Sequence, residues 1–141
     1  MDYEQIFAIS AAGMAAEKTR VQVAALNIAN AQTVAVNGSG AYQPLKVIAR
    51  VVAAPVFGSL VDTALAMRPL VDVVPDEVPP RQVYDPSHPL ASKDGFLNYP
   101  GVDNIGEMVR LMSATRAYEG NVVAFNTIKS LAIKTLEIGG A

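Results

Sequence analysis

Residues 104–140 read NIGEMVRLMSATRAYEGNVVAFNTIKSLAIKTLEIGG and contain no proline. Mostly apolar residues recur along this stretch at alternating steps of three and four positions. They are Met108, Leu111, Thr115, Tyr118, Val122, Phe125, Lys129, Ala132 and Leu136. The spacing predicts a helix from Ile105 to Ile138 with a coiled-coil seam that Thr115 and Lys129 interrupt. Asn104 is expected to cap the helix with Glu107 three residues on, and Gly139-Gly140 to end it.

The predicted helix is long for so small a chain. At 1.5 Å per residue it would extend roughly 50 Å. A helix that is exposed along its whole length is not stable by itself, because most helical stability in proteins comes from packing an apolar face. We therefore expect this helix to pack against another helix of the chain and against neighbouring subunits.

Proline divides the sequence into three parts. All nine prolines lie between Pro44 and Pro100. Because a proline inside a helix costs about 3 kcal/mol, both flanks can form long helices and the middle cannot. The chain is therefore predicted to be α+β, with two long terminal helices forming a coiled coil around a small β-rich middle domain. The expected boundaries are residues 1–36, 37–101 and 102–141.

The N-terminal flank carries a heptad pattern. Asp2 is expected to cap its helix, with Gln5 placed to complete a capping box. Four apolar residues then recur every seven positions, and they are Phe7, Met14, Val21 and Ile28. Gly13 is expected to weaken the helix locally, and the helix is expected to end around Gln32-Thr33.

The middle of the chain shows strand patterns. Alternating residues predict a strand over Leu45–Val51. A flexible loop is predicted at Asn37–Gly40 and a turn at Lys93–Gly95, whereas Val52–Met67 has no clear assignment. Three shorter strands are predicted at Leu70–Val74, Gln82–Tyr84 and Phe96–Tyr99.

The composition excludes several classes of function. Charged residues make up 17% of the chain and the net charge is −2, so no basic excess exists to bind nucleic acid. Apolar residues make up 51% and the mean hydropathy is +0.27, which hints at surfaces buried by partners. The absence of cysteine excludes disulfides, thiolate catalysis and zinc–thiolate sites. Asp2 and Glu4 precede the first basic residue, Lys18, so the N-terminus does not resemble a cleaved secretory signal.

The chain has a single histidine, His88. Asp85, Ser87 and His88 are the residue types of a catalytic triad, but they are crowded between Pro86 and Pro89, which argues against triad geometry. A rigid proline turn with an Asx-type cap is favoured instead. Metal binding through His88 and Asp85 would have too few ligands. No catalytic, cofactor-binding or metal-binding residue is predicted, and the chain is not expected to be an enzyme.

Three segments resemble one protein family. Residues Asn27–Thr33, Asn-Ile-Ala-Asn-Ala-Gln-Thr, resemble the Asn-Ile-Ala-Asn-Ala-x-Thr signature of flagellar rod and hook proteins. Residues Pro79–Pro89 are similar to a proline-rich stretch typical of the proximal-rod branch of that family. Glu107–Val109, Arg116–Glu119 with Asn121, and Lys129-Ser130 resemble its C-terminal helix. The signature residues are Asn27, Ile28, Ala29, Asn30, Thr33, Arg116, Tyr118, Glu119 and Asn121.

Two expectations accompany the resemblance. Asn27 and Asn30 are expected to hydrogen-bond backbone groups where the first helix ends, because asparagine is a poor helix-interior residue and a good cap. Gly106 and Gly120 stand where the family has residues that favour helix more, and they are expected to loosen or bend the last helix.

The resemblance implies a structural subunit of the flagellar proximal rod. The terminal helices would pack as a coiled coil in a hollow drive shaft that transmits torque and lines the export channel. Such a subunit is exported through the flagellar type III apparatus without a cleaved signal peptide and lies in the periplasmic part of the basal body. Implied partners are FlgB, FlgF, FlgG, FliE, the MS ring and further copies of the chain, with no cofactor, nucleic acid or small-molecule substrate. The expected assembly seam consists of Phe7, Met14, Val21, Ile28, Met108, Leu111, Tyr118, Val122, Phe125 and Leu136.

Two other readings remain open from the sequence. A free-standing secreted helical adaptor would keep both heptad patterns but would not need the asparagine signature. A hydrolase that uses Asp85 and His88 is the third reading.

Overall fold

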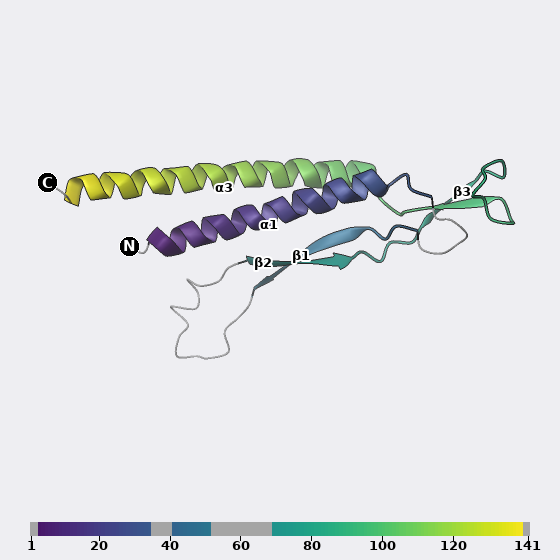
Figure 1. Cartoon of the computed structure of the whole chain (residues 1–141), viewed down its shortest axis with the longest axis horizontal. Coiled ribbons are helices and arrows are strands. Elements are labelled where there is room, and N and C mark those ends of the chain that lie inside the picture. Colours follow the sequence, from purple (N-terminus) through teal and green to yellow (C-terminus); the bar gives the residue numbers. More distant parts are fainter. Residues whose placement is uncertain (1–2, 35–40, 52–68, 140–141) are drawn as a thin grey trace, which may run out of the picture. The chain divides into compact units, whose positions relative to one another are not determined.

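A computed structural model describes residues 3–34, 41–51 and 69–139. Two helices and two strand pairs make up this part of the chain (Figure 1), and the protein is therefore α+β. The elements are α1 (Tyr3–Asn30), β1 (Leu45–Val51), β2 (Pro69–Pro75), β3 (Arg81–Tyr84), β4 (Phe96–Tyr99) and α3 (Asn104–Gly139). The predicted cap at Asp2, the loop at Asn37–Gly40 and the unassigned stretch Val52–Met67 lie outside the described residues.

The helix α1 ends close to the predicted position. The carbonyl oxygen of Asn30 accepts hydrogen bonds from the backbone N–H of Thr33 at 3.0 Å and from its hydroxyl at 2.7 Å. The backbone N–H of Ala31 donates to Ile28 O at 3.2 Å, which forms a tighter final turn. These bonds satisfy carbonyl groups that have no partner inside the helix.

The cap of α3 differs from the prediction. Asp103, and not Asn104, is the capping residue, because its Oδ1 accepts a hydrogen bond from Ile105 N–H at 3.1 Å. Its carbonyl oxygen accepts the first helical bond, from Glu107 N–H at 2.9 Å. A Cβ atom at Gly106 would lie 2.7 Å from Asp103 Oδ2, so glycine leaves the space that the capping carboxylate occupies. The predicted cap at Asn104 with Glu107 is therefore wrong.

Glycine does not interrupt α3. The helix runs through Gly106 and Gly120 to Gly139 without a break. The expected loosening at these two glycines is not seen, since backbone hydrogen bonding continues across both.

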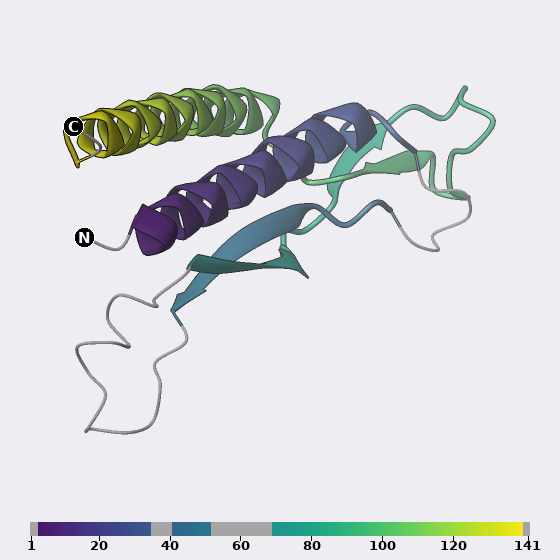
Figure 2. The same cartoon turned by 60° about the vertical axis from the view of Figure 1, so that its left-hand side comes forward.

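The first part of α1 lies along α3 in both views (Figures 1 and 2). The rings of Phe7 and Phe125 are in contact, with centroids 4.9 Å apart and planes tilted by 56°. Gly13, later in α1 than Phe7, lies against Asn121, which is earlier in α3 than Phe125. The two helices therefore run antiparallel.

β1 and β2 form a two-stranded ribbon. Lys46 Nζ lies 2.9 Å from Asp76 Oδ1, and Arg50 Nε lies 3.0 Å from Asp72 Oδ2. Because the earlier residue of β1 pairs with the later residue of the second segment, the two strands are antiparallel. Opposite charges placed across neighbouring strands stabilise a ribbon modestly.

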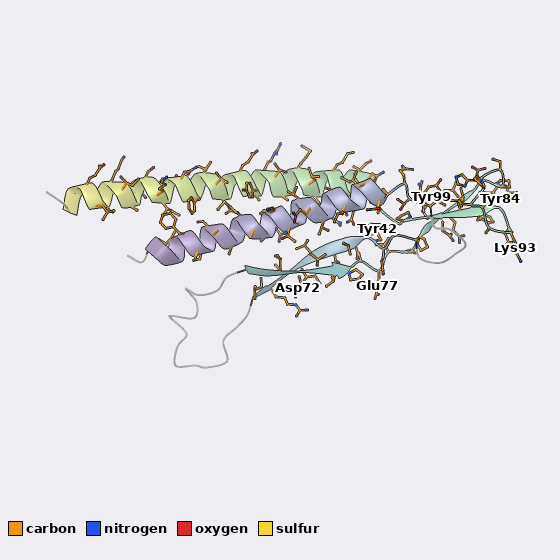
Figure 3. The ribbon with its side chains drawn as sticks, viewed as in Figure 1. Tyr42, Asp72, Glu77, Tyr84, Lys93 and Tyr99 are labelled. Carbon is orange, nitrogen blue, oxygen red and sulfur yellow. The ribbon has the colours of Figure 1, made fainter. Side chains whose placement is uncertain are left out.

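β3 and β4 form the second ribbon, which is antiparallel with Tyr84 opposite Phe96. The predicted turn before β4 is confirmed, because Gly95 N–H donates to Ser92 O at 2.9 Å. Gly95 has φ of 78°, a left-handed conformation that glycine adopts without strain. Leu97 is buried at the centre of this ribbon, while Tyr84 stands exposed near its end (Figure 3).

The described residues group into two compact units. One contains the described parts of Met1–Thr19, Ile48–Asp72 and Ser113–Ala141, and the other contains those of Arg20–Val47 and Val73–Met112. Each unit takes a portion of α1, of α3 and of the β1–β2 ribbon. The predicted three-part division follows secondary structure, whereas these units follow contacts between elements.

Apart from Pro44 and Pro100, the buried apolar residues in the described part of the chain are mostly small. They are Ala16, Val23, Ala24, Ala31, Leu97 and Ala114. Alanine lets helices approach closely but adds little buried area per residue. No helix among the described residues is both long and apolar enough to cross a membrane.

Candidate assembly interface

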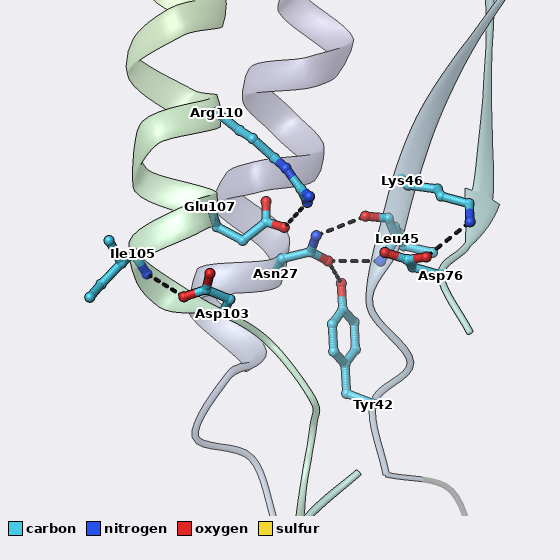
Figure 4. A network of polar contacts seen from close by, with 9 residues as sticks. All are labelled: Asn27, Tyr42, Leu45, Lys46, Asp76, Asp103, Ile105, Glu107 and Arg110. Atoms are coloured by element: carbon cyan, nitrogen blue, oxygen red, sulfur yellow. Dashed lines mark hydrogen bonds and ion pairs between the residues drawn. The ribbon is translucent and has the colours of Figure 1, made fainter. Parts of the chain in front are cut away.

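Asn27 makes the most extensive polar contact of the asparagine signature (Figure 4). Its side chain is fully buried, with 0% of its surface exposed. Its Nδ2 donates to Leu45 O at 2.8 Å, and its Oδ1 accepts from Leu45 N–H at 2.9 Å and from the Tyr42 hydroxyl at 2.8 Å. The amide thus pairs with both backbone groups of one strand residue, as a neighbouring strand would, and fixes the start of β1 to α1.

Tyr42, which donates its hydroxyl to Asn27, is half-buried. The pKa of Tyr42 is raised above its ordinary value, chiefly because burial disfavours the charged form and also because the Glu107 carboxylate is near.

Asn30 acts differently from Asn27, since its Nδ2 donates to Leu26 O inside α1 at 2.9 Å. Asn30 therefore supports the helix end, as predicted for both asparagines, whereas Asn27 binds a strand that lies 18 residues further along the chain.

Glu107 is the buried acidic residue of α3. Its Oε1 lies 2.6 Å from Arg110 Nη1, one helical turn further on. The arginine is itself largely exposed, so it neutralises the carboxylate while remaining in contact with water. A buried carboxylate without such a partner would be costly.

The predicted seam residues have two kinds of surroundings in the single chain. Seven are half-buried, and they are Phe7, Met14, Val21, Ile28, Leu111, Val122 and Phe125. Met108, Tyr118 and Leu136 are exposed. A single chain does not test whether a neighbouring subunit covers these three.

The face of α3 that is turned towards the rest of the chain follows two heptad rows. From Glu107 onwards its residues that are not exposed are Glu107, Leu111, Ala114, Asn121, Val122, Phe125, Ile128 and Ala132. One row, Leu111, Phe125 and Ala132, agrees with the predicted stripe. The other begins at Glu107 instead of Met108, which leaves Thr115 and Lys129 exposed. Small and amide side chains do not stand out as packing residues in a sequence, so this row was not predicted. Val122 of the predicted row is half-buried as well, and its other members stay a prediction for contacts in the assembly.

The C-terminal end of α3 is apolar on several sides. Leu131, Ile133, Leu136 and Ile138 are all exposed. At 100° per residue Leu131 and Ile138 share one side of the helix, whereas Ile133 and Leu136 lie on the roughly opposite side. Exposed aliphatic side chains on two sides of one helix end are candidates for contacts with more than one neighbour.

The signature residues lie in different environments. Asn27 is buried, Ile28, Asn30 and Asn121 are half-buried, and the remaining five are exposed in the single chain. These five are Ala29, Thr33, Arg116, Tyr118 and Glu119. Packing within the chain thus accounts for a part of the signature only.

Side-chain hydrogen bonds hold the turn that contains His88. Asp85 Oδ1 accepts hydrogen bonds from the Ser87 hydroxyl at 2.7 Å and from Ser87 N–H at 3.2 Å. The Ser87 bonds lower the pKa of Asp85, and the nearby His88 adds to the effect. The hydroxyl of Ser87 therefore points to the carboxylate of Asp85 and not to the imidazole. His88 Nδ1 accepts a hydrogen bond from Leu90 N–H at 3.1 Å. This is the Asx-type turn expected from the sequence.

No three histidine, cysteine, aspartate or glutamate side chains lie close enough to hold a metal ion in the described ranges 3–34, 41–51 and 69–139.

Comparison with known families defines the class of protein. The family model described as the C-terminal part of flagellar basal-body rod FlgEFG proteins matches residues 93–138. This segment spans the turn before β4, β4 itself and nearly all of α3. A long terminal helix with an uncovered apolar end therefore coincides with a segment shared by structural proteins of the flagellar rod.

Full-length relatives identify the particular family. The flagellar basal-body rod protein FlgC of Escherichia coli O6:H1 is 39% identical over 134 residues, which cover 95% of this chain and 96% of that protein. FlgC of Salmonella typhimurium is 38% identical over the same shares. FlgC of Bacillus subtilis strain 168 is 32% identical, over 93% of this chain and 94% of that protein. The chain belongs to the FlgC family, and it is a structural component of the flagellar basal-body rod.

Proposed function

We propose that the chain polymerises through its terminal helices into the proximal part of the rod, a hollow drive shaft that transmits torque and lines the export channel. The observation that carries the proposal is the uncovered end of α3. Leu136 and Ile138 are 76% and 80% exposed. Aliphatic side chains with this exposure at the end of a long helix need a partner surface.

Burial of this end would supply a large part of the free energy of assembly. Complete burial of one leucine or isoleucine side chain is worth about 1.5–3 kcal/mol. The four aliphatic residues between positions 131 and 138 are 47–80% exposed, so their burial would together contribute roughly 4–8 kcal/mol before the entropy of association is subtracted. Contacts between copies that are head-to-tail and do not close generate a tube of this kind.

The helices and the middle domain would have separate tasks. Residues 1–36 and 102–141 would form the inner layer of the tube, with the predicted seam residues in its contacts, and residues 37–101 would lie outside. The proposed neighbours are FlgB, FlgF, FlgG, FliE, the MS ring and further copies of the chain. The type III apparatus would export the subunit without cleavage of a signal peptide and deliver it to the periplasmic part of the basal body.

The two other readings have less support. A free-standing adaptor would leave the apolar end of α3 in water, and the FlgC relatives give no indication of such a role. A hydrolase would need His88 as a base beside Ser87, but the hydroxyl of Ser87 donates to Asp85.

Substitution at an exposed position tests the proposal. Leu136→Asp adds a charge where the single chain needs no packing, so the subunit should fold and be exported as before. Rod incorporation and swimming should be lost in a strain that lacks the native gene, because a buried unpaired carboxylate is costly. Leu136→Met is the matched control and should restore both. Normal rods with Leu136→Asp would exclude this surface as an assembly contact.

A further inference from the structure

Gly13 is the one glycine of α1, and it lies where α1 meets α3. A Cβ atom at this position would lie 3.1 Å from Asn121 Nδ2, 3.2 Å from Oδ1 and 3.3 Å from Cγ. Any other residue at position 13 would therefore require the side-chain amide of Asn121 to move by a few tenths of an ångström. Both residues belong to the same compact unit as the Phe7–Phe125 contact.

Neither residue favours the helix in which it stands. Glycine in a helix interior is the least favourable residue except proline, and asparagine is also a poor helix former. Asn121 belongs to the row of α3 that faces the chain, together with Ala114 and Ile128. A single asparagine in such a row is known to specify the register of paired helices at a cost in stability.

The heptad pattern of α1 makes register a real problem. Phe7, Met14, Val21 and Ile28 repeat every seven residues, so a slip by one heptad would present a similar apolar stripe to α3. Such a slip would set Asn121 against Ile6 or Arg20, whose side chains are larger than the single hydrogen of Gly13. Only the observed alignment places a glycine opposite the amide.

We propose that Gly13 and Asn121 form a register lock, in which Asn121 is a positioning residue that permits one alignment of α1 on α3. The lock deepens the proposed function, because the helices must be correctly aligned before they can present a uniform surface for assembly. Its first test does not depend on that function, and its second test does.

The first test compares thermal unfolding of the full chain, followed by its helical circular dichroism signal. Gly120→Ala is the matched control, because Gly120 is also inside a helix and nothing lies within 4 Å of its missing Cβ. The gain in helix propensity should raise its midpoint by about 4 °C. Gly13→Ala should give no such rise, because the methyl group displaces the Asn121 amide.

The coupling between the two residues is decisive. When Gly13→Ala is added to Asn121→Ala, the rise of about 4 °C should return, because the space is now free. If Gly13→Ala raises the midpoint of the otherwise unchanged chain as much as Gly120→Ala does, Asn121 does not occupy the space and the lock is refuted. A double variant without the rise refutes it equally.

The second test separates register from packing. Asn121→Leu keeps the volume of the side chain but removes its amide, so the unfolding midpoint should stay the same or rise. Rod incorporation in a strain without the native gene should fall at least tenfold, because slipped alignments are no longer penalised. The opposite outcome is normal rod incorporation of Asn121→Leu together with failed incorporation of Leu136→Asp. It would support the apolar end of α3 as an assembly contact and would show that Asn121 only fills space.

Discussion

The contact of Asn27 with β1 leads to a quantitative prediction. Asn27→Leu preserves the volume of the side chain, so it opens no cavity, and leucine is the better helix former. The change removes three hydrogen bonds, two to the backbone of Leu45 and one to the hydroxyl of Tyr42. The effect on stability should therefore come almost entirely from the polar groups that are left behind.

The loss in free energy of unfolding depends on whether each group that loses its bond to Asn27 can find another hydrogen-bond partner. A buried polar group that loses its partner costs about 1–3 kcal/mol. The N–H and the carbonyl group of Leu45 are fixed by the strand, whereas the hydroxyl of half-buried Tyr42 can turn towards water. We expect a total loss of about 3 kcal/mol, which would raise the unfolded fraction roughly 100-fold. A small domain is stable by only about 5–15 kcal/mol, so the loss is severe.

Urea unfolding of the full chain, followed by circular dichroism, measures this loss. Asn30→Leu is the matched control, because it makes the same change three residues later in the same motif. The bond of Asn30 lies within α1 and is exposed, so its removal should change the free energy of unfolding by less than about 0.5 kcal/mol. Equal stability of the two leucine variants would refute the reasoning, since it would mean that the Leu45 backbone finds other partners.

Three further predictions concern other parts of the chain. Gly101→Ala should lower the free energy of unfolding by about 2 kcal/mol, because its Cβ would overlap the carbonyl oxygen of Pro79, and Gly120→Ala should raise it; equal effects in urea titrations would contradict this. Tyr42 should titrate above its ordinary pKa of 10.0 because it is partly buried, so stability should be complete below that pH and fall as the pH rises through the raised pKa; a Tyr42→Phe variant with the same alkaline fall would contradict it. In hydrogen exchange, residues 131–139 should exchange quickly in the free chain and slowly in isolated basal bodies, and strong protection in the free chain would show that assembly is not what covers them.

The secondary structure was largely predictable from the sequence. Restriction of proline to the middle and heptad spacing in the flanks indicated two helices, and alternation indicated the strand Leu45–Val51, which β1 matches. Helix ends were less predictable because caps depend on neighbours. Asp103 caps α3 beside Gly106, whereas the sequence pattern shows this glycine only as a poor helix former.

Contacts between distant segments could not be read from the sequence. The signature identified Asn27 as important, but nothing local shows that its amide binds a strand residue 18 positions away. The row of α3 that faces the chain could not be recognised either, because Glu107, Ala114 and Asn121 do not look like core residues. Glutamate is acceptable there because Arg110 neutralises it, and asparagine because it faces a glycine.

The predominance of alanine among the buried apolar side chains of the described residues bears on the proposed export of the subunit. A core of small side chains buries little apolar area, so the work needed to pull the free chain open is modest. In the proposed export through the type III apparatus, such a chain would be opened for passage at a modest cost. In the proposed rod, neighbours that cover α3 would make the assembled subunit harder to open than the free chain.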